Sequence, residues 1–229
     1  SFYKKIYKKN EKITLLNTKE AEITKISINS YITTKITFSN FISEICENTK
    51  GVDASLVLKT IGNDHRIGNS YLGVGTKYSG PCFPRDNKAL DYFIKNKIKN
   101  SLPKFIDKIN DSQTNRIITM IKKIISTERL EKFSIGIFGL TYKDKTSIIK
   151  DSQSYDLIKD LRKKYKGNIN TYDNNIKPNE QFLNKYGLTA FKDIKKFINK
   201  SKILILMYPN KNFIKSTLNA KNKIIIDCW

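Results

Sequence analysis

One short segment holds the residues best suited to nucleophilic chemistry. Cys82 lies in the run Gly-Pro-Cys-Phe-Pro-Arg-Asp of residues 80–86, so a basic side chain, Arg85, and a carboxylate, Asp86, follow within four residues. Nearby positive charge lowers the pKa of a thiol, and the thiolate is the form that attacks carbon. A buried, inert cysteine in a tight turn has the same local pattern, so the residue types alone leave both interpretations open.

The segment around this cysteine has the composition of a functional loop. Residues 66–86 contain four of the ten glycines and two of the five prolines in the chain. Such a density excludes the interior of a helix or of a regular strand. Glycine also lets a backbone approach a ligand closely, which is typical of binding loops.

Helical patterns dominate the first half of the chain. A short strand is expected at residues 12–16, followed by a helix start near Thr18. From Ala21 to Glu47 apolar residues recur at mixed helical spacing, which predicts one long, mostly buried helix. A second helix is expected to begin with Asp53 as its cap and to end at Gly62 in a left-handed turn. Two more helices are expected, over residues 87–95 and 103–126.

After Arg129 the pattern changes to strands that alternate with helices. Strands are expected at residues 133–138, 169–172, 202–207 and 223–227, and helices at residues 152–165 and 191–199. This alternation predicts a parallel sheet in a doubly wound fold. The sequence therefore predicts an α/β protein in which an all-helical part, residues 20–128, precedes a Rossmann-like parallel-sheet domain, residues 129–229.

The net charge of +22 suggests nucleic acid as a partner, but the distribution of the charge does not. Only five of the 43 basic residues are arginine, the residue that reads bases and phosphates with a bidentate fork. The lysines are spread along the whole chain, as expected for solvated faces. Nucleic acid is therefore not expected as a partner. No run of 18 apolar residues occurs, so a membrane is not expected as a partner either.

The three cysteines, Cys46, Cys82 and Cys228, are too few and too unevenly spaced for a disulfide framework. They form no paired motif for zinc, and His65 is the only histidine, so no metal site is expected. A reduced, cytoplasmic protein is the simplest interpretation. Cys46 and Cys228 adjoin apolar runs and are expected to be structural.

Four motifs in the helical half resemble the UDP-glucose/GDP-mannose dehydrogenase family. Residues 80–86 resemble its catalytic-cysteine signature, G-x-C-F-x-K-D, with arginine at the lysine position. Lys25 and Asn29 resemble the lysine and asparagine of its central helix, and their spacing of four places both on one helix face. Residues 61–68 resemble its IGxDxRIG segment, and residues 71–75 occupy the place of its sugar-nucleotide loop.

The second half carries the same resemblance. Residues 137–143 are similar to the LGxxFK motif that opens the family's nucleotide-sugar domain. Lys150 stands where the family has an arginine that reaches the cofactor pyrophosphate, so the charge is kept and the bidentate fork is lost. The chain stops at Trp229, where the family typically continues into a further arginine. Asp173, at the end of a predicted strand, is a weaker candidate for ribose binding.

The resemblance implies a four-electron oxidation of a UDP-hexose to its carboxylate, with two NAD molecules as acceptors. Cys82 would form a thiohemiacetal and then a thioester, Lys25 and Asn29 would stabilise the oxyanion, and Asp86 would assist hydrolysis. Arg66 would reach the substrate across a dimer interface built by the central helices. The residues implied in substrate binding are Arg66, Tyr71, Leu72, Gly75, Ser79, Tyr142 and Lys143.

The resemblance leaves the cofactor domain and the substrate open. The sequence contains no G-x-G-x-x-G motif, so we expect the NAD-binding domain to be absent, residues 1–19 to be its tail, and this chain alone to be inactive. Pro81 precedes the cysteine where the N-acetylhexosamine branch more often has histidine, which favours UDP-glucose. A UDP-N-acetylhexosamine, GDP-mannose, or a non-catalytic module that binds nucleotide sugar and dimerises remain the alternatives.

Overall fold

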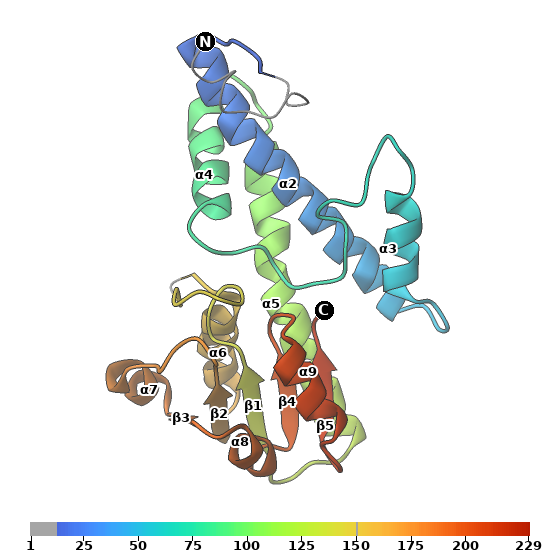
Figure 1. Ribbon diagram of the computed structural model, residues 1–229, viewed down its shortest axis with the longest axis vertical. Coiled ribbons are helices and arrows are strands. Elements are labelled where there is room, and N and C mark those ends of the chain that lie inside the picture. The colour runs from blue at the N-terminus through green and yellow to red at the C-terminus, as the bar shows by residue number, and fades with distance from the viewer. Residues whose placement is uncertain (1–12, 150) are drawn as a thin grey trace.

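The computed structural model of the protein describes residues 13–149 and 151–229. Within these ranges a helical half, which contains helices α2 to α5, is followed by a five-stranded parallel sheet with helices on both faces (Figure 1). This arrangement confirms the predicted fold class, a helical part followed by a parallel-sheet α/β domain.

Helix α2, Thr18–Glu47, begins at a capping box. The side chain of Asn17 accepts a hydrogen bond from the Glu20 amide at 2.9 Å, and the Glu20 carboxylate accepts one from the Asn17 amide at 2.8 Å. The predicted strand at residues 12–16 is wrong for its described part, since residues 13–17 have no regular structure. Their side chains are exposed, and the cap commits the chain to a helix immediately afterwards.

The burial expected for this helix is also wrong. Its apolar side chains are largely exposed: Phe41 has 53% of its surface exposed and Tyr31 64%. The buried face is instead small and polar, and consists of Ser30, Thr33, Thr37, Ser39, Asn40, Ser43 and Cys46. Apolar spacing predicted the helix correctly, but it did not reveal which face lies against the rest of the same chain.

The other helices of this half lie close to their predicted ranges. They are α3 (Ala54–Gly62), α4 (Phe83–Ile94) and α5 (Leu102–Thr127). Asp53 caps α3 as predicted, but the left-handed cap at Gly62 is wrong, because Gly62 is the last helical residue and Asn63 caps the helix in a right-handed conformation. Helix α4 begins directly after Cys82 and therefore starts four residues earlier than predicted.

The sheet has the strand order β3-β2-β1-β4-β5, with all neighbours parallel. Its strands are β1 (Ser134–Phe138), β2 (Asn168–Tyr172), β3 (Leu188–Ala190), β4 (Ile203–Leu206) and β5 (Ile224–Asp227). The four strands predicted after Arg129 all exist, but β3 was not predicted. The order reverses between β1 and β4, and in such sheets ligands bind beyond the carboxyl ends of the strands at this point.

Two apolar cores sandwich the sheet. Helices α6 (Gln153–Lys164) and α7 (Glu180–Tyr186) cover one face, and α8 (Ile194–Lys200) and α9 (Lys211–Leu218) cover the other. The carboxyl-terminal part of α5 also packs into the first core, through Ile117, Ile118 and Ile121. Helix α5 thus belongs to both halves, and the carboxyl ends of the strands point towards the helical half (Figure 1).

Candidate active site

A buried carboxylate gathers three of the sequence-predicted catalytic residues. Asp86 lies in the first turn of α4 and is 4% exposed. Its Oδ2 accepts hydrogen bonds from Lys25 Nζ at 2.8 Å and Asn29 Nδ2 at 2.6 Å, both from α2. Its Oδ1 accepts from Arg85 Nε at 2.9 Å. The spacing of four on α2 therefore does bring Lys25 and Asn29 to one point, as predicted.

These donors keep Asp86 ionised. Burial by itself raises the pKa of the carboxyl group, but the hydrogen bonds from Lys25, Arg85 and Asn29 outweigh it, and the net pKa lies below the ordinary value of 3.8. The same contact, first through its hydrogen bond and then through its charge, raises the pKa of Arg85. The cluster thus combines one carboxylate with an ammonium and a guanidinium, and the Lys25 side chain remains 62% exposed.

Cys82 is the exposed thiol beside this cluster. It is the residue before α4, and its carbonyl accepts the Asp86 amide at 2.9 Å, which places the thiol one turn from the carboxylate. The other two cysteines differ. Cys46 is buried with 5% of its surface exposed, and burial raises the pKa of the Cys228 thiol to about 12. Among the described cysteines, Cys82 is the most exposed, whereas Cys228 is partly buried and Cys46 is buried.

The loop that leads to Cys82 is shaped by contact with the sheet half. Gly80 has φ = +82°, a region that L side chains rarely adopt. A Cβ atom at this position would lie 2.6 Å from the ring of Tyr142, which belongs to the loop after β1. Residue 80 therefore must be small on both counts, and the predicted substrate residue Tyr142 is in contact with the cysteine loop.

Tyr71 also lies beside the start of α4. Its ring meets that of Phe83 edge-on, with centroids 6.5 Å apart, and it is 54% exposed. Its φ of 60° is uncommon for an aromatic residue and costs about 1–3 kcal/mol. In this conformation the exposed ring lies beside Phe83 at the start of α4.

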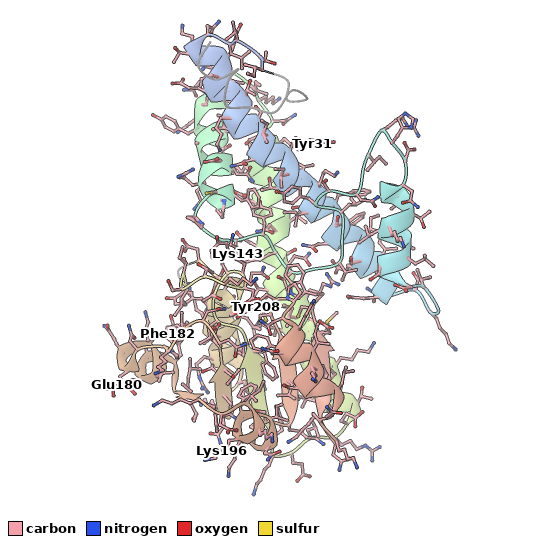
Figure 2. All side chains as sticks on the ribbon, viewed as in Figure 1. Tyr31, Lys143, Glu180, Phe182, Lys196 and Tyr208 are labelled. Carbon is pink, nitrogen blue, oxygen red and sulfur yellow. The ribbon has the colours of Figure 1, made fainter. Side chains whose placement is uncertain are left out.

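The remaining predicted substrate residues occupy different surroundings. Leu72 is 9% exposed, Ser79 is half-buried, and Gly75 lies against the ring of Trp229, 3.0 Å from where its Cβ would be. Lys143 is exposed and lies at the boundary between the two halves (Figure 2). Tyr208, in contrast, is buried. Lys150, the predicted cofactor contact, lies outside the described residues.

Arg66 is not brought to the cysteine in the described chain. It forms an ion pair with Asp64, with Nη2 and Oδ2 2.6 Å apart, and its side chain is 77% exposed. Helices α3 and α4 lie on opposite sides of α2, and Arg66 follows α3 (Figure 1). The predicted route of Arg66 to a substrate across a dimer interface stays a prediction.

A buried polar network behind the cysteine was not predicted. Asn87 follows Asp86 and is 0% exposed; its Nδ2 donates to Asp107 at 2.8 Å and to the Tyr78 hydroxyl at 3.0 Å. Burial, followed by the hydrogen bond to Asp107, raises the pKa of Tyr78. On α2, Thr33 Oγ1 lies 3.1 Å from the same Asn87 nitrogen. The signal for this network in the sequence was the set of polar side chains at helical spacing along α2.

Asp173 organises the loop after β1, and its predicted contact with a ribose stays a prediction. Its Oδ2 accepts the amides of Leu140 at 2.6 Å and Thr141 at 3.2 Å, and its Oδ1 accepts the amide of Asn175 at 2.6 Å. The Tyr208 hydroxyl lies 3.3 Å from Oδ2. With both oxygens engaged by the protein, this carboxylate holds the loop after β1 in place.

The same loop does not fit the pyrophosphate of NAD. In a dinucleotide-binding fold, a tight glycine-rich turn leads from the first strand directly to a helix N-terminus. Here β1 ends at Phe138 and α6 begins only at Gln153. The Ser152 side chain already accepts the Tyr155 amide at 3.1 Å, so one of the free amides of that helix is satisfied internally.

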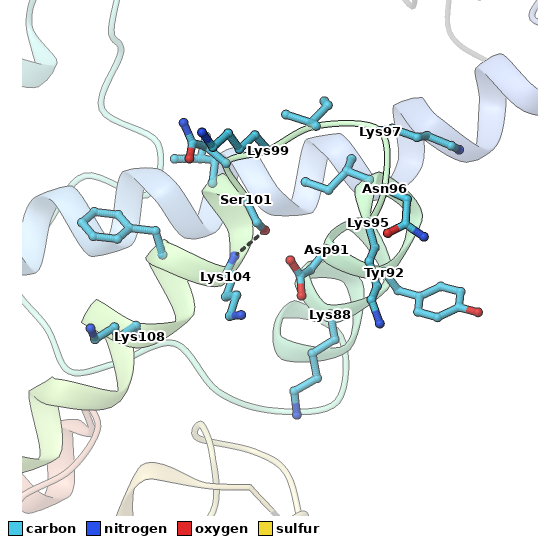
Figure 3. A pocket seen from close by; sticks show the side chains of 15 residues that line it. Lys88, Asp91, Tyr92, Lys95, Asn96, Lys97, Lys99, Ser101, Lys104 and Lys108 are labelled. Carbon is cyan, nitrogen blue, oxygen red and sulfur yellow. Dashed lines mark hydrogen bonds between the residues drawn. The ribbon is translucent and has the colours of Figure 1, made fainter.

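A separate lysine-rich groove lies at the connection between α4 and α5 (Figure 3). Six lysines line it with a single carboxylate, Asp91, and the exposed ring of Tyr92. None of the predicted catalytic or substrate residues belongs to it. Lysine is abundant throughout this chain, so the groove gives no reason to place the chemistry there.

Two further properties of the described residues concern a membrane and a metal. No helix within residues 13–149 and 151–229 combines the length and the apolar character needed to cross a membrane. Over the same ranges, no three His, Cys, Asp or Glu side chains gather as a metal site would require.

Comparison with known proteins connects both halves to one family. Residues 19–112 match the central domain of the UDP-glucose/GDP-mannose dehydrogenase family, and residues 136–229 match the UDP binding domain of that family. A relative named UDP-glucose 6-dehydrogenase, from Rickettsia bellii, is 37% identical over 143 residues, which are 62% of this chain and 32% of the relative. The matched region thus spans about a third of that relative.

Solved structures agree on the fold. A UDP-glucose dehydrogenase from Pyrobaculum islandicum superposes with a TM-score of 0.83 and 22% identity, covering 99% of this chain and 52% of that one. A UDP-D-ManNAc dehydrogenase from Pyrococcus horikoshii superposes with a TM-score of 0.77 and 19% identity, covering 96% of this chain and 50% of that one. Two domains of one family match in order and together cover most of this chain. The chain therefore belongs to the UDP-glucose/GDP-mannose dehydrogenase family.

Proposed function

We propose that this chain supplies the nucleophilic thiol and the nucleotide-sugar site for the oxidation of a UDP-hexose, with UDP-glucose to UDP-glucuronate as the preferred reaction. The observation that carries the proposal is the convergence at α4: an exposed Cys82 lies one turn from Asp86, which is bonded to Lys25 and Asn29. A thiol, an ammonium and an amide beside one another suit covalent chemistry at an aldehyde carbon.

The first step assigned to the chain's own residues is addition to the aldehyde formed at C6. The Cys82 thiolate forms a bond to carbon, the carbonyl π bond breaks, and the oxygen takes a proton to give a thiohemiacetal. Lys25 and Asn29 carry the donors that would stabilise the negative oxygen as it develops. The Lys25 side chain is 62% exposed, so its ammonium is accessible from solvent.

The second step is hydrolysis of the thioester. Water adds to the carbonyl carbon, the carbon–sulfur bond breaks, and the carboxylate and the Cys82 thiolate are formed with release of two protons to the solvent. The lowered pKa of Asp86 makes it a weak base, so we assign it mainly to holding Lys25 and Asn29 in place.

One hydride must leave the C6 alcohol before the first step, and a second must leave the thiohemiacetal before the second step; NAD is the acceptor that the family resemblance implies. The loop after β1 does not fit a dinucleotide. Both steps above involve only the residues of this chain, so neither depends on how NAD is held. The sheet half is assigned to UDP, on the family match of residues 136–229. Lys143, exposed at the boundary facing the helical half, would contact the sugar or a phosphate.

A dimer through α2 is part of the proposal. Tyr31, Phe38, Phe41 and Ile45 leave a row of exposed apolar surface on this helix. Apolar patches of this kind are typical of protein interfaces. The exposed Cys82 thiol favours a reducing compartment, so we propose the cytoplasm as the location.

Calorimetric titration of the chain with nucleotide sugars tests the proposal. UDP-glucose and UDP should bind, GDP-mannose should bind at least about tenfold more weakly, and UDP-N-acetylmannosamine tests the hexosamine alternative. Saturating UDP-glucose should also protect Cys82 from iodoacetamide. Binding of UDP-glucose without any protection of Cys82 would support the non-catalytic module instead, and absence of UDP binding would contradict the proposal.

A further inference from the structure

Lys77 is a buried cation in the segment that carries Cys82. It lies five residues before the cysteine and is 8% exposed. Its Nζ forms an ion pair with Asp156 and lies 3.5 Å from Asp111 Oδ1. Removing an ammonium from water is costly, so a lysine in this position depends on its carboxylate partners.

The two partners come from different halves of the molecule. Asp111 is on α5, whereas Asp156 is in the first turn of α6, the helix that follows the loop after β1. The ion pair with Asp156 therefore joins the cysteine segment to the sheet half. The contact of Tyr142 with Gly80 joins the same two segments at a second point, closer to Cys82.

The backbone beside Lys77 is fixed as well. The amide of Tyr78 donates to Asn110 Oδ1 at 2.8 Å, and its carbonyl accepts from Asn110 Nδ2 at 3.0 Å. Asn110 is adjacent to Asp111 on α5. A displacement of α6 against α5 must therefore either break the ion pair of Lys77 or move the cysteine segment.

We infer that Lys77 is a positioning residue that sets where Cys82 stands relative to the sheet half. The inference rests on the proposed function, in which the sheet half holds the nucleotide and the thiol must meet the hexose. Lys77 itself stays out of the chemistry, because both carboxylates already engage its ammonium. It acts on where the cysteine segment is held, whichever hexose is bound.

Hydrogen exchange of residues 75–82 tests the positioning directly. Lys77→Met keeps the length of the side chain and removes the charge, and Asp156→Asn removes only the partner in the sheet half. Both should raise amide exchange in this segment about tenfold or more, because local opening becomes easier. Asp111→Asn is the matched control, since its contact is longer and its side chain is 74% exposed, and it should change exchange by less than about twofold.

Protection of Cys82 separates positioning from a merely structural role. We expect Lys77→Met to bind UDP within about threefold of the original chain, while saturating UDP-glucose protects its Cys82 from iodoacetamide about fivefold less well. Lys77→Arg, which keeps the charge, should restore most of the protection. If Lys77→Met does not fold, Asp156→Asn decides the question by the same two measurements.

The two proposals can fail separately. If UDP-glucose does not protect Cys82 in the original chain, the proposed function fails and the exchange measurement still decides the role of Lys77. Unchanged exchange in Lys77→Met, or full protection of its Cys82, would overturn the inference.

Discussion

At the scale of single residues, the site depends on one carboxylate that is expensive to bury. Asp86 is 4% exposed and offsets that cost with hydrogen bonds from Lys25, Asn29 and Arg85. The same bonds hold an ammonium and an amide beside the cysteine turn. The carboxylate therefore links the stability of this region to the arrangement that the chemistry needs.

The cysteines should differ sharply in reactivity. Iodoacetamide should modify Cys82 at least about tenfold faster than Cys46 or Cys228, because only Cys82 is exposed and burial raises the pKa of the Cys228 thiol to about 12. Mass spectrometry of digested samples taken over time measures the three rates. A Cys82→Ser variant should lose the fast phase; modification of Cys228 first would contradict the assignment.

Replacement of Asp86 should change how stability depends on pH. The pKa of Asp86 is lowered in the folded chain, so its ion pairs stabilise the fold above the ordinary value of 3.8 and this stabilisation is lost as the pH falls through the lower, folded value. Asp86→Asn should therefore cost about 2 kcal/mol at pH 7 and flatten the decline of stability in acid.

Urea unfolding between pH 2 and 8 measures that effect. Asp91→Asn, on the same helix but outside the ion pairs of Asp86, is the control and should leave the curve almost unchanged. If the free energy of unfolding of Asp86→Asn falls as steeply in acid as that of the original chain, the Asp86 carboxylate is not the group responsible for the decline.

Residue types predicted the proposed catalytic group but not the residues that support it. The spacing of Lys25 and Asn29 and the turn at Cys82 could be recognised in the sequence, because each belongs to a short local motif. Lys77 could not be distinguished among so many lysines that are solvated. Its burial comes from Asp111 and Asp156, which are distant in sequence, so only the folded chain reveals it.

At the scale of elements, helix α4 and the loop before it control the direction of the thiol. The loop turns at Gly80 with φ = +82°, packs against Tyr142, and enters α4 directly after Cys82. The exposed Cys82 thiol consequently lies at the start of a helix whose first turn carries Asp86.

Gly80→Ala should destabilise this turn. A Cβ would be both strained at this φ and 2.6 Å from the Tyr142 ring, so we expect a loss of about 1–3 kcal/mol in urea unfolding. Gly73→Ala is a suitable control, because nothing lies within 4 Å of its Cβ position and its φ is not in the left-handed region. Equal stabilities of the two variants would show that the turn tolerates a side chain.

Secondary structure was predictable where an element is long or strongly apolar. The long helices α2 and α5 and strands β1, β2, β4 and β5 follow from periodicity or continuous apolar runs. The short elements α7, β3 and α9 have three to eight residues each and were not predicted. At that length tertiary packing, more than local pattern, decides the structure.

At the scale of the whole molecule, the two faces of α2 differ in whether the rest of the chain covers them. Its polar face is buried within the chain, and its apolar face is exposed. Periodicity alone could not assign these faces, since it reports that a helix is amphipathic but not which face meets its own chain. A partner on the apolar face gives that pattern a physical reason.

Phe41→Asp should therefore weaken self-association. A carboxylate placed in an apolar interface loses its hydration without a partner, so the dimer should dissociate at least about tenfold more readily. Sedimentation equilibrium measures the dissociation constant. Leu218→Asp, at an apolar residue on α9 that is 79% exposed against 53% for Phe41, is the control. Equal effects of the two changes would contradict an interface through α2.

The central claim, that Cys82 adds to the C6 aldehyde of a bound UDP-hexose, has a direct test that needs no hydride acceptor. The chain is incubated with the 6-aldehyde of UDP-glucose, with UDP-glucose or with UDP, each at the same fractional occupancy, and the rate of iodoacetamide modification of Cys82 is followed. The account predicts that the aldehyde protects Cys82 at least about tenfold better than UDP-glucose, because a thiohemiacetal removes the free thiolate. Equal protection by the aldehyde and the alcohol would contradict it.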